Sequence, residues 1–488
     1  MTTNDSTGTP HSSGKRALVF GASGYIGSNL VPHLVKSGWH VRAAARNLAV
    51  LEARNWLNVE LVQADALQPD TLDAALADIE VAFYLVHSMA AGEDFDRLDA
   101  KAAENFREAC TIAGVKRIVY LGGLVPEVGG GTHIDSRKET GEILRAGPTP
   151  TTEIRAGIII GPGSAAFEVM RDLVLHLPIM VTPRWVRAKS PPIALSNLLH
   201  YLAQAPLLPE GVFDTGGSEL CSYEDMMRTL ARVAGKKPPF IIPVPVLSPE
   251  LSAYWLALTT AVPANIARAL IGGLRNDFAA DDKAIKALIP QHLLSMEEAI
   301  ESAFDDERSQ QTVTRWTEGA FALRNFRHDI AYYAKRANGE AVANASAEAI
   351  WQQVSTIGGT NRYYYMNALW SLREWMDWLV GGPGLSRGRR HPTELRVGDV
   401  IDYWTVVGLE PARRLTLHFG LKAPGAGILE FEIEPINKEQ TSIKVTAYWH
   451  PRGVWGLAYW YAMVPVHLFV FKGWTRAIAR RAESSPGT

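Results

Sequence analysis

Three glycines spaced three residues apart, Gly21, Gly24 and Gly27, follow a short apolar run at residues 17–20. At the junction of a strand and a helix, this spacing predicts a tight turn, room for a pyrophosphate and close helix packing, in that order. The helix start would offer unpaired N–H groups and its positive dipole end to phosphate. The motif therefore predicts a dinucleotide-binding turn, and the alternative is a glycine-rich turn without a ligand. The candidate contacts are Gly21, Ser23, Gly24, Tyr25, Ile26 and Gly27.

Arg46 ends the second expected strand and bears on which dinucleotide would bind. A site selective for NAD usually has a carboxylate there for the ribose 2′-hydroxyl, whereas an arginine accommodates the 2′-phosphate of NADP. Residues 40–51 contain no carboxylate. We therefore predict NADP as the cofactor. NAD remains the alternative if Arg46 is simply an exposed residue at a strand end.

The elements that would position these residues alternate regularly along the first part of the chain. Strand patterns occur at residues 17–20, 40–46, 59–64, 81–86, 117–121 and 152–160, with helical patterns between them. Such alternation predicts an α/β fold with a doubly wound parallel sheet and a ligand at the carboxyl ends of its strands. We expect a disordered tail at 1–14 and a Rossmann domain at 15–308, with a substrate-side lobe from about residue 165.

A second domain of different composition is expected at residues 326–488. A short helical pattern at 347–354 precedes strand-like runs at 399–407, 414–421, 428–436 and 442–450, and a long aromatic helical pattern closes the chain. One early helix, an antiparallel sheet and a long closing helix are typical of an α+β helix-grip fold around a cavity. The arginines at 387, 389 and 390 are interpreted as an anion clamp or as a solvated loop.

Residues 453–471 carry no formal charge and are rich in aromatic side chains. The segment is long enough for a membrane span, but it contains Pro465 and His467. We interpret it as the closing helix of the cavity domain. The alternatives are a weak peripheral membrane contact and a membrane span, since the cations that follow it, from Lys472 to Arg481, suit both a helix end and anionic lipid.

The amino-acid composition argues against several classes of protein and partner. The 488 residues are 47% hydrophobic and 20% charged, with a net charge of −2, so no basic field indicates nucleic acid as a partner. Cys110 and Cys221 lie far apart and outside any metal-spacing motif, which favours a reduced, cytoplasmic protein with no metal site. The polar residues at the start contain no apolar stretch typical of a signal peptide.

The first 300 residues or so resemble the atypical short-chain dehydrogenase/reductases, which have an NAD(P)-binding Rossmann domain. The matching stretches are residues 19–27, 41–46, 64–66, 84–87 and 154–161. The resemblance implies that Asp65, with Ala66, lies where this family contacts the adenine amino group; a helix cap or an Asx turn is the alternative. Leu85 and Val86 would flank the adenosine. His87 would lie on the cofactor side, as a structural histidine or as a proton carrier.

The sequence departs from that family at the catalytic positions. The usual reductase has a serine at the end of the fifth strand and a Tyr-x-x-x-Lys pair on the next helix. Here the strand ends in Gly122 and Gly123, and no such pair occurs in the first 300 residues. His133 and Arg137 keep the four-residue spacing, so a histidine could shuttle a proton and an arginine could hold ribose hydroxyls. Lys138 is the alternative residue to hold the ribose. The alternative to any catalytic role is that His133 is a surface histidine beside a solvated basic run.

The C-terminal part resembles a bacterial domain of unknown function that often follows this reductase domain and is similar to lipid-binding START-like cavities. The matching runs are residues 357–359, 369–370, 387–390, 397–399 and 451–453. The leading interpretation is an NADP-dependent oxidoreductase whose C-terminal cavity holds an apolar or lipid-like ligand. The alternative is a non-catalytic NADP(H)-binding sensor or scaffold, which the missing serine and tyrosine favour. Substrate and oligomeric state are left open.

Overall fold

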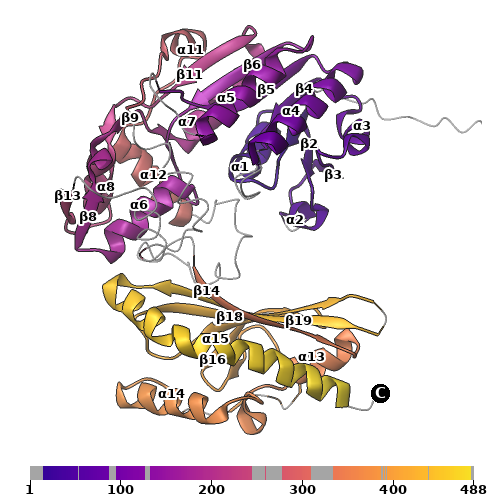
Figure 1. Cartoon of the computed structure of the whole chain (residues 1–488), viewed down its shortest axis with the longest axis vertical. Coiled ribbons are helices and arrows are strands. Elements are labelled where there is room, and N and C mark those ends of the chain that lie inside the picture. The colour runs from indigo at the N-terminus through magenta and orange to yellow at the C-terminus, as the bar shows by residue number, and fades with distance from the viewer. Residues whose placement is uncertain are drawn as a thin grey trace, which may run out of the picture.

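The computed structural model contains two large, separate β-sheets, one in each half of the chain (Figure 1). The structure describes residues 15–52, 54–86, 95–126, 132–244, 259, 277–308, 334–385, 388–389, 391, 393–437 and 439–484. The expected disordered tail at 1–14 and His87 lie outside the described residues.

The first sheet has seven parallel strands in the order β11-β6-β5-β4-β1-β2-β3. The strands are β1 (Arg16–Phe20), β2 (His40–Ala45), β3 (Val59–Gln63), β4 (Val81–Tyr84), β5 (Arg117–Gly123), β6 (Thr151–Ala156) and β11 (Gly211–Thr215). The order reverses between β1 and β4, which is the switch point where a doubly wound sheet binds its ligand. The predicted parallel Rossmann-like sheet is thereby confirmed, and β11 is a strand that the sequence analysis missed.

Helices cover both faces of this sheet. The helices are α1 (Tyr25–Lys36), α2 (Leu48–Glu52), α3 (Leu72–Leu76), α4 (Phe95–Ile112), α5 (Thr132–Arg145) and α7 (Leu195–Gln204). Apolar residues of α1 and α7 share one buried cluster with the sheet, and those of α3 and α4 share another. The sheet is therefore buried on both faces, which is why its strands read as nearly continuous apolar runs.

A lobe follows β6 and packs around its own apolar core. It contains α6 (Ala165–His176), α8 (Tyr223–Val233) and α12 (Met296–Arg308), with the short strands β7 (Ile159–Ile160), β8 (Ile179–Pro183), β9 (Lys189–Ser190), β10 (Ile193–Ala194), β12 (Cys221–Ser222) and β13 (Phe240–Val244). The helix α11 (Lys283–Leu288) instead packs beside β11 and adds Ile285 to the core of the sheet. Ser222 and Asp225 form a capping box at the start of α8. The strand expected over residues 152–160 is in fact two strands, β6 and β7, because the chain leaves the sheet after Ala156.

The second sheet is antiparallel, in the order β14-β19-β18-β17-β16-β15. Its strands are β14 (Lys335–Ala343), β15 (Val400–Ile401), β16 (Trp404–Glu410), β17 (Arg414–Phe419), β18 (Gly425–Pro435) and β19 (Thr441–Pro451). The helices α13 (Ala347–Ser355), α14 (Asn367–Leu379) and α15 (Gly453–Ser484) accompany it. The antiparallel sheet with its long closing helix is confirmed, whereas β14 and α14 were not expected, and the START-like identity remains a resemblance.

The long helix α15 packs on the second sheet through Phe471, Trp474 and Ile478, all of which are buried. Within the described residues it is the one helix long and apolar enough to cross a membrane. Only 28% of its most apolar 18-residue window is buried. The expectation of a closing helix is therefore met in the second half of α15, while much of its first half lies at the surface.

Candidate functional site

A cavity of about 450 Å³ lies at the carboxyl ends of the first sheet's strands. Its walls come from the loop after β1, the ends of β4, β5 and β6, and the lobe. Five of the predicted cofactor contacts line it: Gly24, Tyr25, Ile26, Leu85 and Val86. This is the edge at which doubly wound sheets bind nucleotides, and the volume falls within the range of small-molecule sites.

The glycine turn has the shape that a pyrophosphate requires. Gly21 has φ +91°, and a methyl group there would press on the backbone of Leu85. A methyl group at Gly27 would collide with the Gly21 carbonyl oxygen. At Gly24, the residue that caps α1, the nearest described atom would be the Gly21 oxygen at 3.3 Å. The first and third glycines are thus needed by the fold itself, and the second keeps the cavity clear beside the helix N-terminus.

The expected adenosine side of the site is less enclosed. Arg46 is exposed, and its carbonyl oxygen accepts a hydrogen bond from the Gln63 side chain. Asp65 Oδ1 accepts the N–H of Leu67 at 3.0 Å, so the Asx turn, one of the two alternatives for this residue, is formed. Ala66 is buried.

Arg54 is a second cation at this end that sequence analysis missed. Its Nη2 donates to the carbonyl oxygen of Ser23, in the glycine turn, at 3.3 Å. The residue lies between α2 and β3, and no motif marks it. Its position follows from the tertiary fold, which brings the end of α2 beside the turn.

The residues proposed for catalysis separate in the structure. Arg137 lines the cavity, and its Nη2 donates to the Leu121 carbonyl oxygen at 2.8 Å. Lys138 is exposed and lies 3.9 Å from a carboxylate oxygen of Glu142 on the outer side of α5. His133 belongs to α5, but its side chain lies outside the described residues. Of the two candidate ribose holders, Arg137 is therefore the one that reaches the cavity.

The end of β5 is shaped around Arg137. A methyl group at Gly123 would lie 3.5 Å from Nε of Arg137, so the guanidinium packs where the usual serine would stand. The Tyr120 hydroxyl donates to the carbonyl oxygen of Arg137 at 3.1 Å, and burial raises the pKa of Tyr120. An arginine can hold hydroxyl groups but does not exchange protons near neutral pH.

Hydroxyl groups that sequence analysis did not consider line the opposite wall, which the lobe supplies. Ser164, Ser190 and Tyr223 all border the cavity. Ser164 Oγ donates to the Ile159 carbonyl oxygen at 2.6 Å, and burial raises the pKa of the Tyr223 phenol. The capping box at Ser222 is a local signal that places Tyr223 at a helix start, but nothing local shows that it faces the nucleotide turn.

Two family models match this chain, one in each half. Residues 21–150 match the family described as NAD(P)H-binding, and residues 328–474 match the protein family of unknown function DUF2867. The chain therefore carries an NAD(P)H-binding domain. The predicted cofactor class is thereby confirmed.

Several known proteins resemble this reductase-like domain. The ceramide reductase of Caulobacter vibrioides (strain NA1000 / CB15N) is 25% identical over 252 residues, which cover 49% of this chain and 78% of that protein. Cinnamoyl-CoA reductase 1 of Oryza sativa subsp. japonica is 29% identical over 119 residues, 22% of this chain and 35% of that protein. The structure of a Citrobacter sp. triphenylmethane reductase complexed with NADP(H) is 21% identical, covers 59% of this chain and 99% of its own, and has a TM-score of 0.48.

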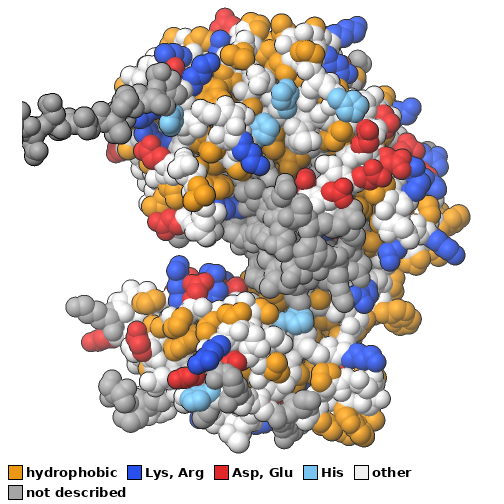
Figure 2. Space-filling view, turned by 180° about the vertical axis from the view of Figure 1, so that it is seen from behind, with side chains coloured by type: hydrophobic (Ala, Val, Ile, Leu, Met, Phe, Trp, Pro, Cys, Tyr) orange, Lys and Arg blue, Asp and Glu red, His pale blue; other side chains and the backbone are white. Residues whose placement is uncertain are grey.

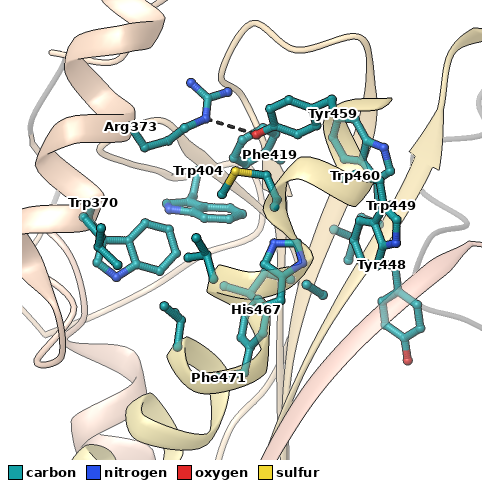
Figure 3. A pocket seen from close by; sticks show the side chains of 18 residues that line it. Trp370, Arg373, Trp404, Phe419, Tyr448, Trp449, Tyr459, Trp460, His467 and Phe471 are labelled. Atoms are coloured by element: carbon teal, nitrogen blue, oxygen red, sulfur yellow. Dashed lines mark hydrogen bonds between the residues drawn. The ribbon is translucent and has the colours of Figure 1, made fainter. Parts of the chain in front are cut away.

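The DUF2867 domain has a cavity of its own, of about 130 Å³, between α14, α15 and the antiparallel sheet (Figure 3). Eight of its eighteen lining residues are Phe, Trp or Tyr, including Trp370, Trp404 and Trp460. One arginine and one histidine also line it, Arg373 and His467. The Arg373 Nε donates to the Tyr459 hydroxyl at 3.1 Å, so the guanidinium is held at one end of the cavity.

His467 lies in the middle of this cavity, with its ring against those of Trp460 and Phe471 (Figure 3). Burial lowers its pKa to about 4, so the imidazole is neutral near pH 7. Its Nδ1 is buried and has no hydrogen-bond partner among the described residues. A ligand hydroxyl or carbonyl group would supply that partner.

The low pKa of His467 predicts acid sensitivity of the DUF2867 domain. Because His467 binds a proton near pH 6.5 when unfolded and only near pH 4 when folded, its contribution to stability is complete above pH 6.5 and lost as the pH falls toward 4. The loss is at most about 3 kcal/mol. We expect His467→Phe to reduce the difference in unfolding free energy between pH 7.5 and pH 4.5, measured by urea denaturation. His292→Phe, at an exposed site, is the control, and equal acid sensitivity in both variants would contradict this assignment.

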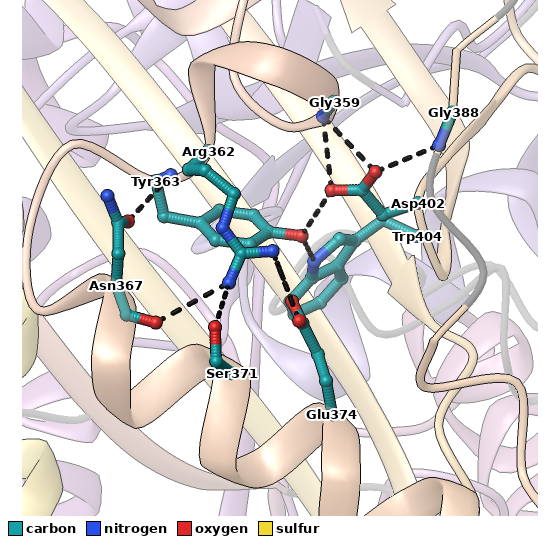
Figure 4. A network of polar contacts seen from close by, with 9 residues as sticks. All are labelled: Gly359, Arg362, Tyr363, Asn367, Ser371, Glu374, Gly388, Asp402 and Trp404. Carbon is teal, nitrogen blue, oxygen red and sulfur yellow. Dashed lines mark hydrogen bonds and ion pairs between the residues drawn. The ribbon is translucent and has the colours of Figure 1, made fainter.

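A buried carboxylate organises the loop before α14 (Figure 4). Asp402 accepts the N–H groups of Gly359 and Gly388 at 3.1 Å each and the Tyr363 hydroxyl at 3.0 Å. Trp404 Nε1 in turn donates to the Tyr363 oxygen at 3.2 Å. Every contact is internal to the domain, so we assign this network to folding and not to ligand binding.

Arg389 has a similar internal role. Its guanidinium donates to the carbonyl oxygens of Ser355, Ile357 and His391 at 2.7, 2.9 and 2.7 Å. It therefore neither clamps an anion nor lies solvated, as the two sequence-based interpretations had it. Arg387 and Arg390 lie outside the described residues.

Proposed function

We propose that this chain is an NADPH-dependent reductase of an apolar carbonyl compound. The observation that carries the proposal is the cavity of about 450 Å³, in which the nucleotide turn at Gly24 and the lobe residues Ser190, Tyr223 and Phe278 border one space. A cofactor on the turn and a substrate under the lobe would share that space. Its walls are mostly apolar with a few polar groups, as in sites for small organic ligands.

The proposed roles follow from position. The backbone at Gly24 would hold the pyrophosphate, and Arg46 and Arg54 would hold the 2′-phosphate. Arg137 would hold ribose hydroxyls. NADPH would supply a hydride to the carbonyl carbon. Ser190 or Tyr223 would donate the proton that the alcohol oxygen needs, since Ser164 is already bonded to a carbonyl oxygen and Arg137 does not exchange protons.

The substrate class that we propose is a carbonyl on a long apolar chain. The apolar lining supports it, and so does the name of one relative, a ceramide reductase. A turnover screen with NADPH tests the proposal, using lipid-like ketones, simple ketones and quinones and following absorbance at the nicotinamide band. We expect oxidation of NADPH only with apolar carbonyls. Tyr223→Phe and Ser190→Ala, tested separately, should show which hydroxyl is needed.

A non-catalytic NADPH-binding sensor or scaffold is the second candidate. It is favoured by Arg137, which stands beside the end of β5 and is tied to the Leu121 carbonyl oxygen. Tight NADPH binding in a titration, with no oxidation across the whole panel of carbonyls, would support this function and refute the reductase.

We further propose that the DUF2867 cavity holds a small apolar group with one hydroxyl or carbonyl, paired with His467. The size supports this, because apolar cavities of similar volume stay dry and bind benzene-sized molecules. Phenol should raise the thermal midpoint of the full chain more than toluene does. The same shift in His467→Phe as in the parent would contradict a role for the imidazole.

Cofactor preference gives a direct prediction for Arg46. We expect Arg46→Ala to weaken NADPH binding about 10- to 100-fold and NADH binding less than about 3-fold, because only NADPH carries the 2′-phosphate. Fluorescence titration of both nucleotides measures the ratio. Lys36→Ala, an exposed cation at the far end of α1, is the matched control. Equal losses for the two nucleotides would remove the basis for the NADP assignment.

A further inference from the structure

Helix α14 of the DUF2867 domain buries acidic residues and exposes apolar ones, which is the reverse of an ordinary surface helix. Its fully buried residues are acidic, Glu374 and Asp377. Its apolar residues Leu372, Trp375, Met376 and Leu379 recur at helical spacing on one face and are between 52% and 57% exposed. An apolar stripe of this kind normally faces a core. Here it faces outward.

Polar contacts hold the helix in this orientation. Glu374 accepts two hydrogen bonds from Arg362 Nη1, at 3.0 and 3.1 Å. Asp377 accepts the backbone N–H groups of Gly384, at 2.9 Å, and of Lys422. Rotating α14 to bury its apolar stripe would leave these carboxylates and their donors unpaired, at a cost of several kcal/mol. The outward face is therefore a fixed feature of the fold.

Helix α15 is hydrogen-bonded to α14, and its first turn also carries exposed apolar side chains. The hydrogen bond between Arg373 of α14 and the Tyr459 hydroxyl joins the two helices. Trp455 lies one turn before Tyr459 on the same side of α15 and is 78% exposed. We call the stripe of α14 together with Trp455 the apolar edge. In Figure 2, hydrophobic side chains gather at the lower right of the molecule, near one end of α14.

In the described segments that carry the apolar edge and the loop beside it, the exposed charges are positive. The segments 366–385, 421–425 and 451–469 are described throughout, and their acidic residues are Glu374 and Asp377, both fully buried. Lys422 and Arg452 are exposed there, and Lys422 Nζ donates to the Val380 carbonyl oxygen at 2.9 Å, next to the end of α14. A partner for this surface must therefore offer an apolar interior beside negative charge.

We propose that the apolar edge docks onto a lipid bilayer that contains anionic lipids. An interfacial helix with tryptophans and leucines on one face and cations beside it matches such a surface, where tryptophan prefers the headgroup level. Lys422 and Arg452 would meet the anionic headgroups. The association is peripheral, because Phe471 and Trp474 of α15 are committed to the domain core. If the chain is the reductase that we propose, it would then lie at the bilayer in which its lipid-like substrate is dissolved.

Vesicle co-sedimentation tests the docking surface. The full chain should bind vesicles of equal parts phosphatidylcholine and phosphatidylglycerol, and bind phosphatidylcholine alone at least about 5-fold less. Trp375→Glu/Leu379→Glu should lower the bound fraction at least about 10-fold. Leu57→Glu, at an 83% exposed site in the other half of the chain, is the matched control and should bind as the parent does.

Two results would overturn the proposal. One is a parent chain that stays in the supernatant with both kinds of vesicle. The other is a parent chain that forms dimers in sedimentation velocity, loses them in Trp375→Glu/Leu379→Glu, and does not bind vesicles, because a second copy would then be the occupant. Circular dichroism of the variant checks that it is folded, and the exposed positions of both residues favour this.

Discussion

Gly24→Val is expected to lower the affinity for NADPH at least about 100-fold while the chain remains folded. Gly24 has φ −73° and ψ 172°, which valine adopts without strain. Its side chain would fill the space beside the α1 N-terminus where we propose that the pyrophosphate binds. The cost to the fold is a poorer helix cap, about 1 kcal/mol, and a close approach of the new Cβ to the Gly21 carbonyl oxygen at 3.3 Å. Isothermal titration with NADPH and thermal unfolding measure the two effects separately.

Two further substitutions, one within α1 and one at its C-terminal end, serve as controls for Gly24→Val. Ser37→Val, at the exposed C-terminal end of α1, should bind NADPH as the parent does. Gly27→Val should unfold more easily, since a side chain there meets the Gly21 carbonyl oxygen and the backbone of Ala22. Parent-like NADPH affinity in Gly24→Val would refute the proposed binding turn.

Asp402→Ala is expected to destabilise the DUF2867 domain by about 3 kcal/mol or more, lowering its thermal midpoint by about 6–12 °C. The carboxylate is 4% exposed, and it accepts hydrogen bonds from Gly359, Gly388 and Tyr363. Alanine would remove the acceptor from all three donors, of which the Tyr363 hydroxyl is fully buried. Differential scanning calorimetry of the full chain would show the change in the transition of this domain.

Two milder substitutions test whether the destabilisation in Asp402→Ala comes from the loss of the hydrogen-bond network or from any change at this position. Tyr363→Phe removes one hydroxyl from the network and should cost about 1 kcal/mol. Asp402→Asn keeps an acceptor oxygen and tolerates the φ of +54° at this position, so its cost should lie between the other two. Equal midpoints for Asp402→Ala and the parent would show that the network does not support the fold.

The parallel sheet and the place of the nucleotide turn could be predicted because both depend on short-range patterns. The glycine spacing at 21, 24 and 27 encodes a backbone shape within seven residues, and alternating strand and helix patterns leave few connections open. The extra strand β11 was missed because it follows the lobe and pairs with β6, some sixty residues earlier. No local pattern records that pairing.

The composition of the site depends on contacts between distant segments. Arg54 reaches Ser23 across the turn, and Ser190 and Tyr223 reach the cavity from the lobe. The four-residue spacing of His133 and Arg137 was visible in the sequence. That Arg137 packs against the end of β5 while Lys138 faces Glu142 depends on how α5 sits on the sheet.

Helix α14 shows most clearly which features follow from the sequence and which depend on the tertiary structure. The sequence analysis did not predict this helix, although the spacing of Leu372, Trp375, Met376 and Leu379 places them on one face of any helix formed there, because helical periodicity is local. Only the tertiary structure decided which way that face points. Arg362 and the backbone N–H groups of Gly384 and Lys422 come from outside the helix, and they hold its two carboxylates in the interior. Pairing buried charges outweighs burying the apolar stripe, and those partners are chosen by the fold.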